Sequence, residues 1–132
     1  MTAPADAISR IGFRRWYERQ LVESHAWLVA CFIAIILVAA GIELLSIKRG
    51  LADFAFDALL IGGSLLGAWF SWRRYAWIMM RADFIGEQAN CPACDHYGFR
   101  CDRTVAATFE ARCPKCKHQW RVAQPGATDG PP

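Results

Sequence analysis

The stretch NCPACDHYGFRCDRTVAATFEARCPKCKHQWRV (residues 90–122) contains two C-P-x-C motifs. Eighteen residues, 95 to 112, separate the two pairs of cysteines. Each C-x-x-C turn presents two thiolates from one loop, and two such loops can complete a tetrahedral set of sulfur ligands. This spacing is typical of zinc sites. The sequence therefore predicts one metal site, with zinc as the expected ion, formed by Cys91, Cys94, Cys113 and Cys116.

The length of this stretch also favours a metal. About 30 residues are too few to fold around an apolar core alone and need a disulfide or a metal as a staple. We expect strands at 97–100 and 106–110 around a polar turn at Asp102 and Arg103, and a third strand from Trp120. In that arrangement Cys101 lies in the turn as a free thiol, with replacement of a metal ligand as its alternative role.

The two motifs, CPAC (91–94) and CPKCKHQW (113–120), resemble those of bacterial zinc ribbons. The resemblance covers about a quarter of the chain and implies a zinc-ribbon fold without implying an activity. Rubredoxins share paired C-x-x-C motifs and bind iron, but usually place Gly after each second cysteine, where this chain has Asp95 and Lys117. Iron is therefore kept as the alternative metal. His96 and His118 are expected to be exposed loop residues, with metal binding as their alternative role.

Composition sets the rest of the chain apart from a soluble enzyme. The 132 residues are 55% hydrophobic and 20% charged, with a net charge of +3. Such a chain is too apolar to be disordered. Most of its apolar residues lie between Ala26 and Met80, which leaves little on either side for a large soluble core.

Two apolar runs predict a transmembrane helical hairpin. Residues 26–42 carry no charge, and extension to Ile47 gives a helix of about 33 Å, enough for a hydrocarbon core of ~30 Å. The uncharged part of the second run, 58–72, is shorter, and its helix is expected to continue past Arg73 and Arg74 into water. Cys31 falls within the first span and is expected to be a small core residue.

Basic residues near the helix ends predict the orientation, because they remain on the cytoplasmic side. Seven arginines flank the two outer ends of the hairpin, whereas the connecting loop has two basic residues. Both termini are therefore expected in the cytoplasm, across a bacterial inner membrane. Aromatic residues at the same ends would form a belt at the inner interface. The basic residues are Arg10, Arg14, Arg15, Arg19, Arg73, Arg74 and Arg81 at the ends and Lys48 and Arg49 in the loop; the belt residues are Trp16, Tyr17, Trp27, Trp69, Trp72, Tyr75 and Trp77.

Small residues recur at four-residue intervals in both spans and predict close helix packing. We expect these faces to pack the hairpin internally, or alternatively to contact a partner helix or a second copy. The first face consists of Ala26, Ala30 and Ala34, and the second of Gly63, Gly67 and Ser71.

Three acidic residues lie toward the outer ends of the spans. Asp53 is expected in the headgroup region. Glu43 and Asp57 either lie in the headgroup region as well or are functional groups, since intramembrane carboxylates often serve as proton relays or ion sites.

The segment before the first span, 8–25, has a helical period with an aromatic face and basic residues elsewhere. It predicts a helix lying on an anionic leaflet, or alternatively a straight extension of the first span.

The predicted fold is an α-helical membrane protein, a two-helix hairpin with an N-terminal interfacial helix and a small all-β zinc ribbon. Its predicted parts are an interfacial segment (1–25), a first transmembrane helix (26–47), an outer loop (48–53), a second transmembrane helix with its extension (54–80), a linker (81–89), the ribbon (90–122) and a disordered Pro/Gly-rich tail (123–132).

We see no catalytic constellation and expect no enzyme activity or small-molecule substrate. The favoured function is a non-catalytic accessory, assembly or regulatory subunit of an inner-membrane complex, with that complex and membrane lipids as partners. A membrane-tethered nucleic-acid-binding ribbon is an alternative, since residues 91–121 carry a net charge of +3 from six basic and three acidic residues. Its candidate base-stacking residues are Tyr97, Phe99, Phe109 and Trp120. A rubredoxin-like iron electron carrier is the other alternative.

Overall fold

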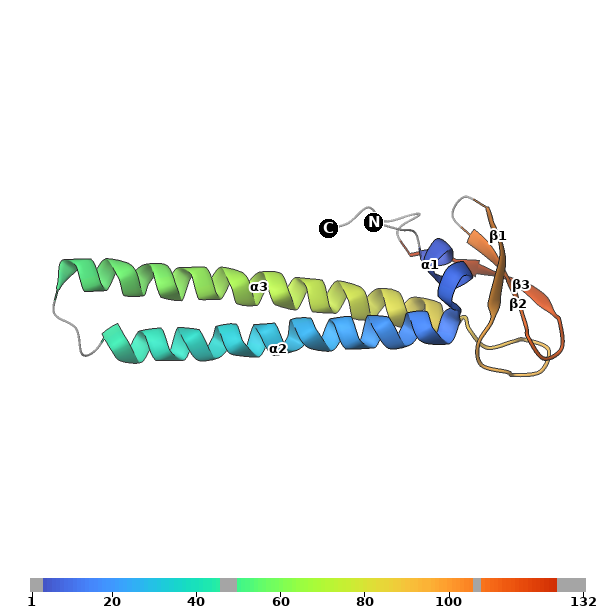
Figure 1. Cartoon of the computed structure of the whole chain (residues 1–132), viewed down its shortest axis with the longest axis horizontal. Coiled ribbons are helices and arrows are strands. Elements are labelled where there is room, and N and C mark those ends of the chain that lie inside the picture. The colour runs from blue at the N-terminus through green and yellow to red at the C-terminus, as the bar shows by residue number, and fades with distance from the viewer. Residues whose placement is uncertain (1–3, 46–49, 106–107, 126–132) are drawn as a thin grey trace. The chain divides into compact units, whose positions relative to one another are not determined.

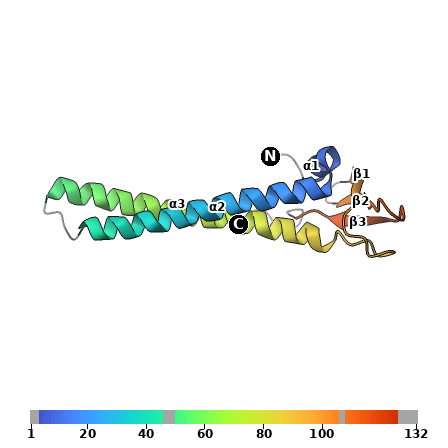
Figure 2. The same cartoon turned by 60° about the horizontal axis from the view of Figure 1, so that its bottom comes forward.

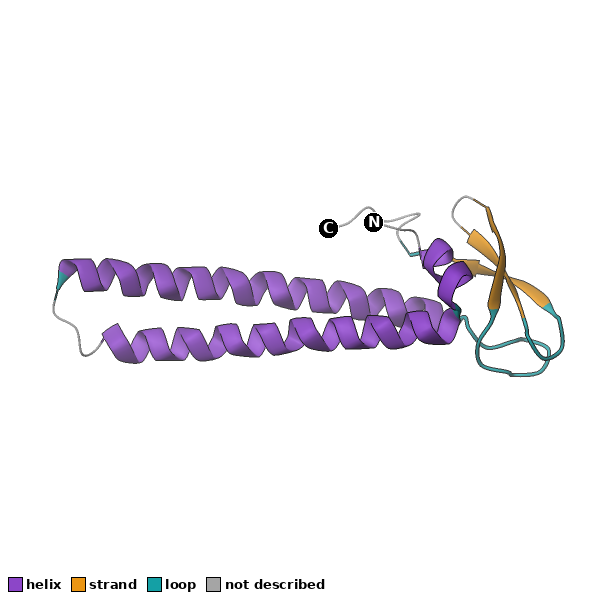
Figure 3. Cartoon of the chain, in the orientation of Figure 1, coloured by secondary structure: helices purple, strands orange, loops and turns teal. Residues whose placement is uncertain are grey.

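The computed structural model describes residues 4–45, 50–105 and 108–125. Three helices precede a three-stranded sheet (Figures 1 and 3). The chain forms two units: the hairpin unit, Val22–Ile78, and the head unit, made from the residues up to Leu21 and those from Met79 onward. The elements are α1 (Pro4–Ile11), α2 (Phe13–Leu45), α3 (Leu51–Glu87), β1 (Arg100–Val105), β2 (Thr108–Arg112) and β3 (Gln119–Ala123).

In the hairpin unit, α2 and α3 are both long and apolar enough to cross a membrane, judged by length and composition. Their 33 and 37 residues exceed the roughly 20 that a membrane span needs. Large apolar side chains point outward, among them Phe32 at 58% and Leu66 at 72% exposure. Such side chains are normally buried in a water-soluble protein. Lys48 and Arg49 of the expected outer loop lie outside the described residues.

Small side chains do line the contact between α2 and α3, which run side by side in two views (Figures 1 and 2). The Cys31 thiol donates to the carbonyl of Ala68 at 3.7 Å. A Cβ on Gly41 would lie 2.7 Å from Ile61 Cγ1, so only glycine permits this approach. The position expected for Cys31, a small residue in the helix contact, is therefore confirmed. The other buried polar residues of the unit are Ser24, Asp57, Ser64 and Ser71.

The predicted four-residue faces are wrong as the internal interface. Of the six residues in these two faces, only Ala34 and Ser71 are buried. A Cβ on Gly63 or Gly67 would meet no atom within 4 Å, so the glycines face away from α2. Residues four apart are offset by about 40° around a helix, so a four-residue stripe rotates out of a straight contact. Within the hairpin unit, the buried positions of α3 instead recur every seven residues, which is the repeat of a coiled coil: Asp57, Ser64, Ser71 and Ile78. Outside the contact, Ala26, Gly63 and Gly67 are exposed and Ala30 is half-buried.

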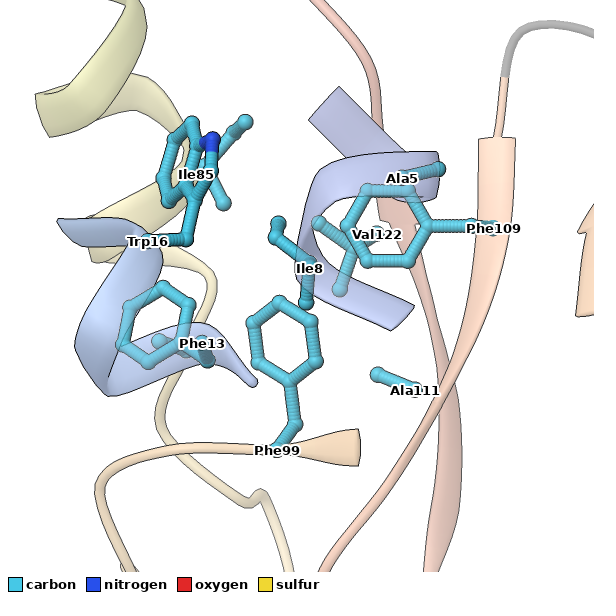
Figure 4. Close-up of a cluster of buried hydrophobic side chains, with 10 residues drawn as sticks. Ala5, Ile8, Phe13, Trp16, Ile85, Phe99, Phe109, Ala111 and Val122 are labelled. Atoms are coloured by element: carbon cyan, nitrogen blue, oxygen red, sulfur yellow. The ribbon is translucent and has the colours of Figure 1, made fainter. Parts of the chain in front are cut away.

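The head unit has one apolar core drawn from three distant parts of the chain (Figure 4). The N-terminal part, α1 and the first turn of α2, covers the apolar face of the sheet, and the end of α3 closes one side. Gly12, with φ +84°, separates α1 from α2. The buried members are Ala5, Ile8, Phe13, Trp16, Ile85, Ala89, Phe99, Phe109, Ala111 and Val122.

This core revises two expectations for the parts beside the spans. Phe13 and Trp16 are 4% and 2% exposed, so their rings face the ribbon and do not lie on a membrane surface or in an aromatic belt. From Phe13 onward the segment belongs to the same helix as the first span, α2. Residues 81–87, expected to be a linker, are the last turns of α3, because Ile85 packs into the same core.

The sheet is antiparallel with the order β1-β2-β3. The predicted turn at Asp102 and Arg103 is wrong. These two residues and Cys101 lie within β1. Asp102 is held there because it pairs with Arg112 on β2 at 2.6 Å and accepts a hydrogen bond from Gln119 on β3 at 3.2 Å. The strand continues through β-branched residues to Val105. Residues 106–107, including the expected start of the second strand, and the tail from 126 lie outside the described residues.

Candidate metal centre

The two C-P-x-C motifs form equivalent turns. In the first, the amide of Cys91 donates to the carbonyl of His96 at 3.0 Å, and that of Asp95 donates to the carbonyl of Cys91 at 2.9 Å. In the second, the amide of Cys113 donates to the carbonyl of His118 at 2.9 Å, and that of Lys117 donates to the carbonyl of Cys113 at 3.2 Å. The two turns therefore share the same backbone hydrogen-bond pattern.

Each turn contains one residue with a left-handed backbone, directly after its second cysteine. Asp95 has φ 54° and Lys117 has φ 65°. Glycine adopts this conformation without strain, whereas an L side chain adds steric cost. Both turns adopt the left-handed conformation although the glycines are missing. For that reason, their absence does not distinguish this centre from an iron site.

The four predicted cysteine ligands are brought together. All four Sγ atoms lie within 4.8 Å of one another. The Sγ atoms of Cys91 and Cys116 are 3.5 Å apart, and those of Cys94 and Cys113 are 3.6 Å apart. A tetrahedral ion with sulfur ligands at ~2.3 Å requires Sγ–Sγ separations of about 3.8 Å. A disulfide requires about 2.05 Å, and all four cysteines are free thiols. The arrangement fits a tetrahedral metal ion.

Backbone amides point at the Cys113 sulfur. Those of Lys115 and Cys116 donate to it at 3.4 and 3.5 Å. Burial raises the pKa of Cys113, but these amides together with the thiols of Cys94 and Cys116 lower it to about 6. Hydrogen bonds to sulfur stabilise the thiolate, which is the form that binds metal.

Cys94 holds its proton more strongly. A backbone hydrogen bond from His96 lowers the pKa of Cys94, but burial and the thiols of Cys116, Cys113 and Cys91 together raise it to about 12. Four close thiols resist carrying several negative charges together, because like charges disfavour one another. A divalent cation removes this repulsion and displaces the protons, so metal binding releases protons.

The centre is closed on one side and open on the other. Cys91 and Cys113 are buried, Cys94 is half-buried and Cys116 is exposed. Within the described part of the chain, the ligand cluster contains cysteines alone. His118 is outside it, and its ring stacks 6.4 Å from that of Trp120. His96 is also outside it and closes the first turn through its carbonyl.

The other sequence candidates are not members of the four-cysteine cluster. Cys101 is half-buried in β1 and packs against the core of the head unit. Desolvation raises the pKa of its thiol. In the hairpin unit Asp57 is fully buried and Glu43 is exposed. The structure therefore distinguishes the two acidic candidates by burial.

Sequence reasoning missed the residues that attach the ribbon to the end of α3. The indole Nε1 of Trp120 donates to the carbonyl of Gln88 at 3.0 Å. The side-chain oxygen of Gln88 accepts a hydrogen bond from the amide of Ala123 at 2.9 Å. Gly98 donates to the carbonyl of Ala89 at 3.0 Å. Nothing in the local pattern around Gln88 indicates these contacts.

Comparison of the chain with protein families, curated proteins and solved structures finds no match in any of the three. The geometry of the four-cysteine cluster and the two apolar helices are therefore the basis for a function.

Proposed function

We propose that this chain is a membrane-anchored zinc-ribbon protein. It acts as a non-catalytic accessory, assembly or regulatory subunit of a bacterial inner-membrane complex. The observation that carries the proposal is the cluster of four Sγ atoms within 4.8 Å, in a chain that also has two helices apolar and long enough to span a membrane.

A structural role for zinc follows from the ligand set. Four thiolates fill a tetrahedral coordination sphere, whereas a catalytic zinc keeps a position for water or substrate. Zinc also accounts for the folding of a small head, since its binding can supply on the order of 10 kcal/mol. The reducing cytoplasm expected for the head favours metal over disulfides.

Membrane insertion is supported by the side chains near the inner end of the hairpin. The guanidinium of Arg73 lies 6.0 Å from the ring of Trp69, and that of Arg74 lies 5.3 Å from the ring of Trp77. Arg74 also pairs with Glu23 at 3.6 Å. Arginine and tryptophan at one level are typical of a membrane–water interface, with the basic residues on the cytoplasmic side.

An orientation test uses single introduced cysteines in a chain with Cys31 and Cys101 replaced by serine. A membrane-impermeant thiol reagent should modify Leu51→Cys in intact cells. It should modify Arg103→Cys only after the cells are opened. The reverse pattern contradicts the proposed topology.

A partner helix is expected on the outward face of α3 that contains Gly63 and Gly67, because small residues allow close helix approach in lipid. The tagged chain, extracted in mild detergent, should co-purify with a membrane protein in a fixed ratio. Gly63→Leu and Gly67→Leu should reduce that ratio, whereas Ala58→Leu, which also introduces a leucine side chain but at another exposed position, should not. A chain that is always a solitary monomer under gentle extraction contradicts the accessory role.

The alternatives are less well supported. Phe99 and Phe109 are buried in the core, which removes two of the expected base-stacking residues. Arg112 on the sheet is neutralised by Asp102. Salt-sensitive binding of DNA or RNA to the full chain would support the nucleic-acid-binding alternative. Iron at the same sulfurs would be recognised by colour and metal analysis of protein purified without added zinc.

A further inference from the structure

We propose that metal binding at the four cysteines controls whether the N-terminal helix α1 is docked on the ribbon. With metal bound, α1 is folded and packed on the sheet; without metal, α1 is released and unfolds. The inference rests on the proposed metal site, and it adds a conformational response in residues about 80 positions away in the sequence.

Helix α1 depends on its platform for stability. It has eight residues, and isolated helices shorter than ~12–15 residues are marginal in water. Its buried side chains are Pro4, Ala5 and Ile8, and the last two belong to the core of the head unit. Gly12 ends α1 in a left-handed conformation, so the helix does not continue into α2 and gains no support from it.

The platform in turn depends on the cysteine turns. Phe99 lies two residues after Tyr97, and its ring lies 4.8 Å from that of Phe13 and 5.4 Å from that of Phe109. Figure 4 shows Phe99 beside Ile8 of α1. The first turn is closed by pairing of Asn90 with Tyr97.

The second turn anchors the other two strands. Cys113 follows the last residue of β2, and the turn leads into β3. A sheet this small cannot keep its apolar face ordered without a staple. Metal loss therefore removes the ordered surface on which Ile8 packs.

Hydrogen exchange measured by mass spectrometry tests the coupling on the full chain in detergent, with zinc and after chelation. We expect the amides of residues 8–12 to exchange at least tenfold faster after zinc removal, while those of residues 28–41 in the hairpin stay unchanged. A metal-binding protein whose α1 amides keep their protection after chelation overturns this inference but leaves the metal site intact. A chain that binds no metal instead contradicts the proposed function.

The coupling must also act in reverse, because linkage between two sites is reciprocal. Ile8→Asp, which undocks α1, should weaken zinc affinity by the factor that zinc adds to docking, on the order of 5- to 150-fold for typical couplings. Ser9→Asp places the same charge on the exposed face of α1 and should leave zinc affinity unchanged. Equal zinc affinity in the Ile8→Asp and unaltered chains would overturn the inference, as would an equal loss in the two variants.

Discussion

Truncation of Phe109 should strongly destabilise the head unit while leaving the hairpin in place. Phe109 is fully buried and packs 5.4 Å from the ring of Phe99, between the sheet and α1. Replacing a buried Phe with Ala typically costs about 3–5 kcal/mol, because apolar contacts are lost and a cavity remains. A loss of ~4 kcal/mol shifts the unfolding equilibrium roughly a thousandfold. That is a large part of the 5–15 kcal/mol that stabilises an ordinary domain.

The assay is equilibrium denaturation of the zinc-loaded full chain in detergent, followed by hydrogen exchange of peptides from the head unit. Phe84→Ala is the control, since Phe84 lies on α3 with 42% of its surface exposed and should cost less than about 1 kcal/mol. Equal losses of unfolding free energy in the two variants would refute the assignment of Phe109 to the core of the head unit. So would a Phe109→Ala head that is as stable as that of the unaltered chain.

Three further predictions concern single residues of the head. Lys117→Gly should stabilise the zinc-loaded head by about 1 kcal/mol, because glycine relieves the left-handed strain at φ 65°; a lower denaturation midpoint would contradict that assignment. Trp120→Phe should destabilise the head by about 0.5–1.5 kcal/mol through loss of the hydrogen bond to Gln88, and the same midpoint as the unaltered chain would show that this bond is not formed. Cys101 should be alkylated more slowly at pH 8 than an unfolded-chain cysteine, because its raised pKa reduces the reactive thiolate; labelling followed by mass spectrometry measures the rate, and faster alkylation would contradict the burial of this thiol.

The four-cysteine cluster could be predicted because its information is local. A C-P-x-C turn determines its own hydrogen bonds, so the spacing was enough to identify Cys91, Cys94, Cys113 and Cys116. The apolar character of the two helices was equally readable, because hydropathy sums over many residues. The limits of the strands could not be predicted in the same way, because they depend on tertiary contacts. The position of Asp102 in β1, for example, depends on its pairing with Arg112.

The apolar core of the head unit could not be predicted from the sequence, since its members are distant along the chain. Ile8 and Phe13 show an apolar face, which suits a membrane surface and a protein core equally well. Only the fold supplies Phe99 as their neighbour. The helix contact was misassigned for a geometric reason, because a four-residue repeat, as in Gly63 and Gly67, does not stay on one side of a long helix.

X-ray absorption spectroscopy of the full chain, purified without added metal, tests the central claim most directly. The account predicts a zinc edge with four sulfur neighbours at ~2.3 Å and one ion per chain. An absorber with nitrogen or oxygen ligands in the place of sulfur, or a chain without metal whose four cysteines are joined as disulfides, would contradict it.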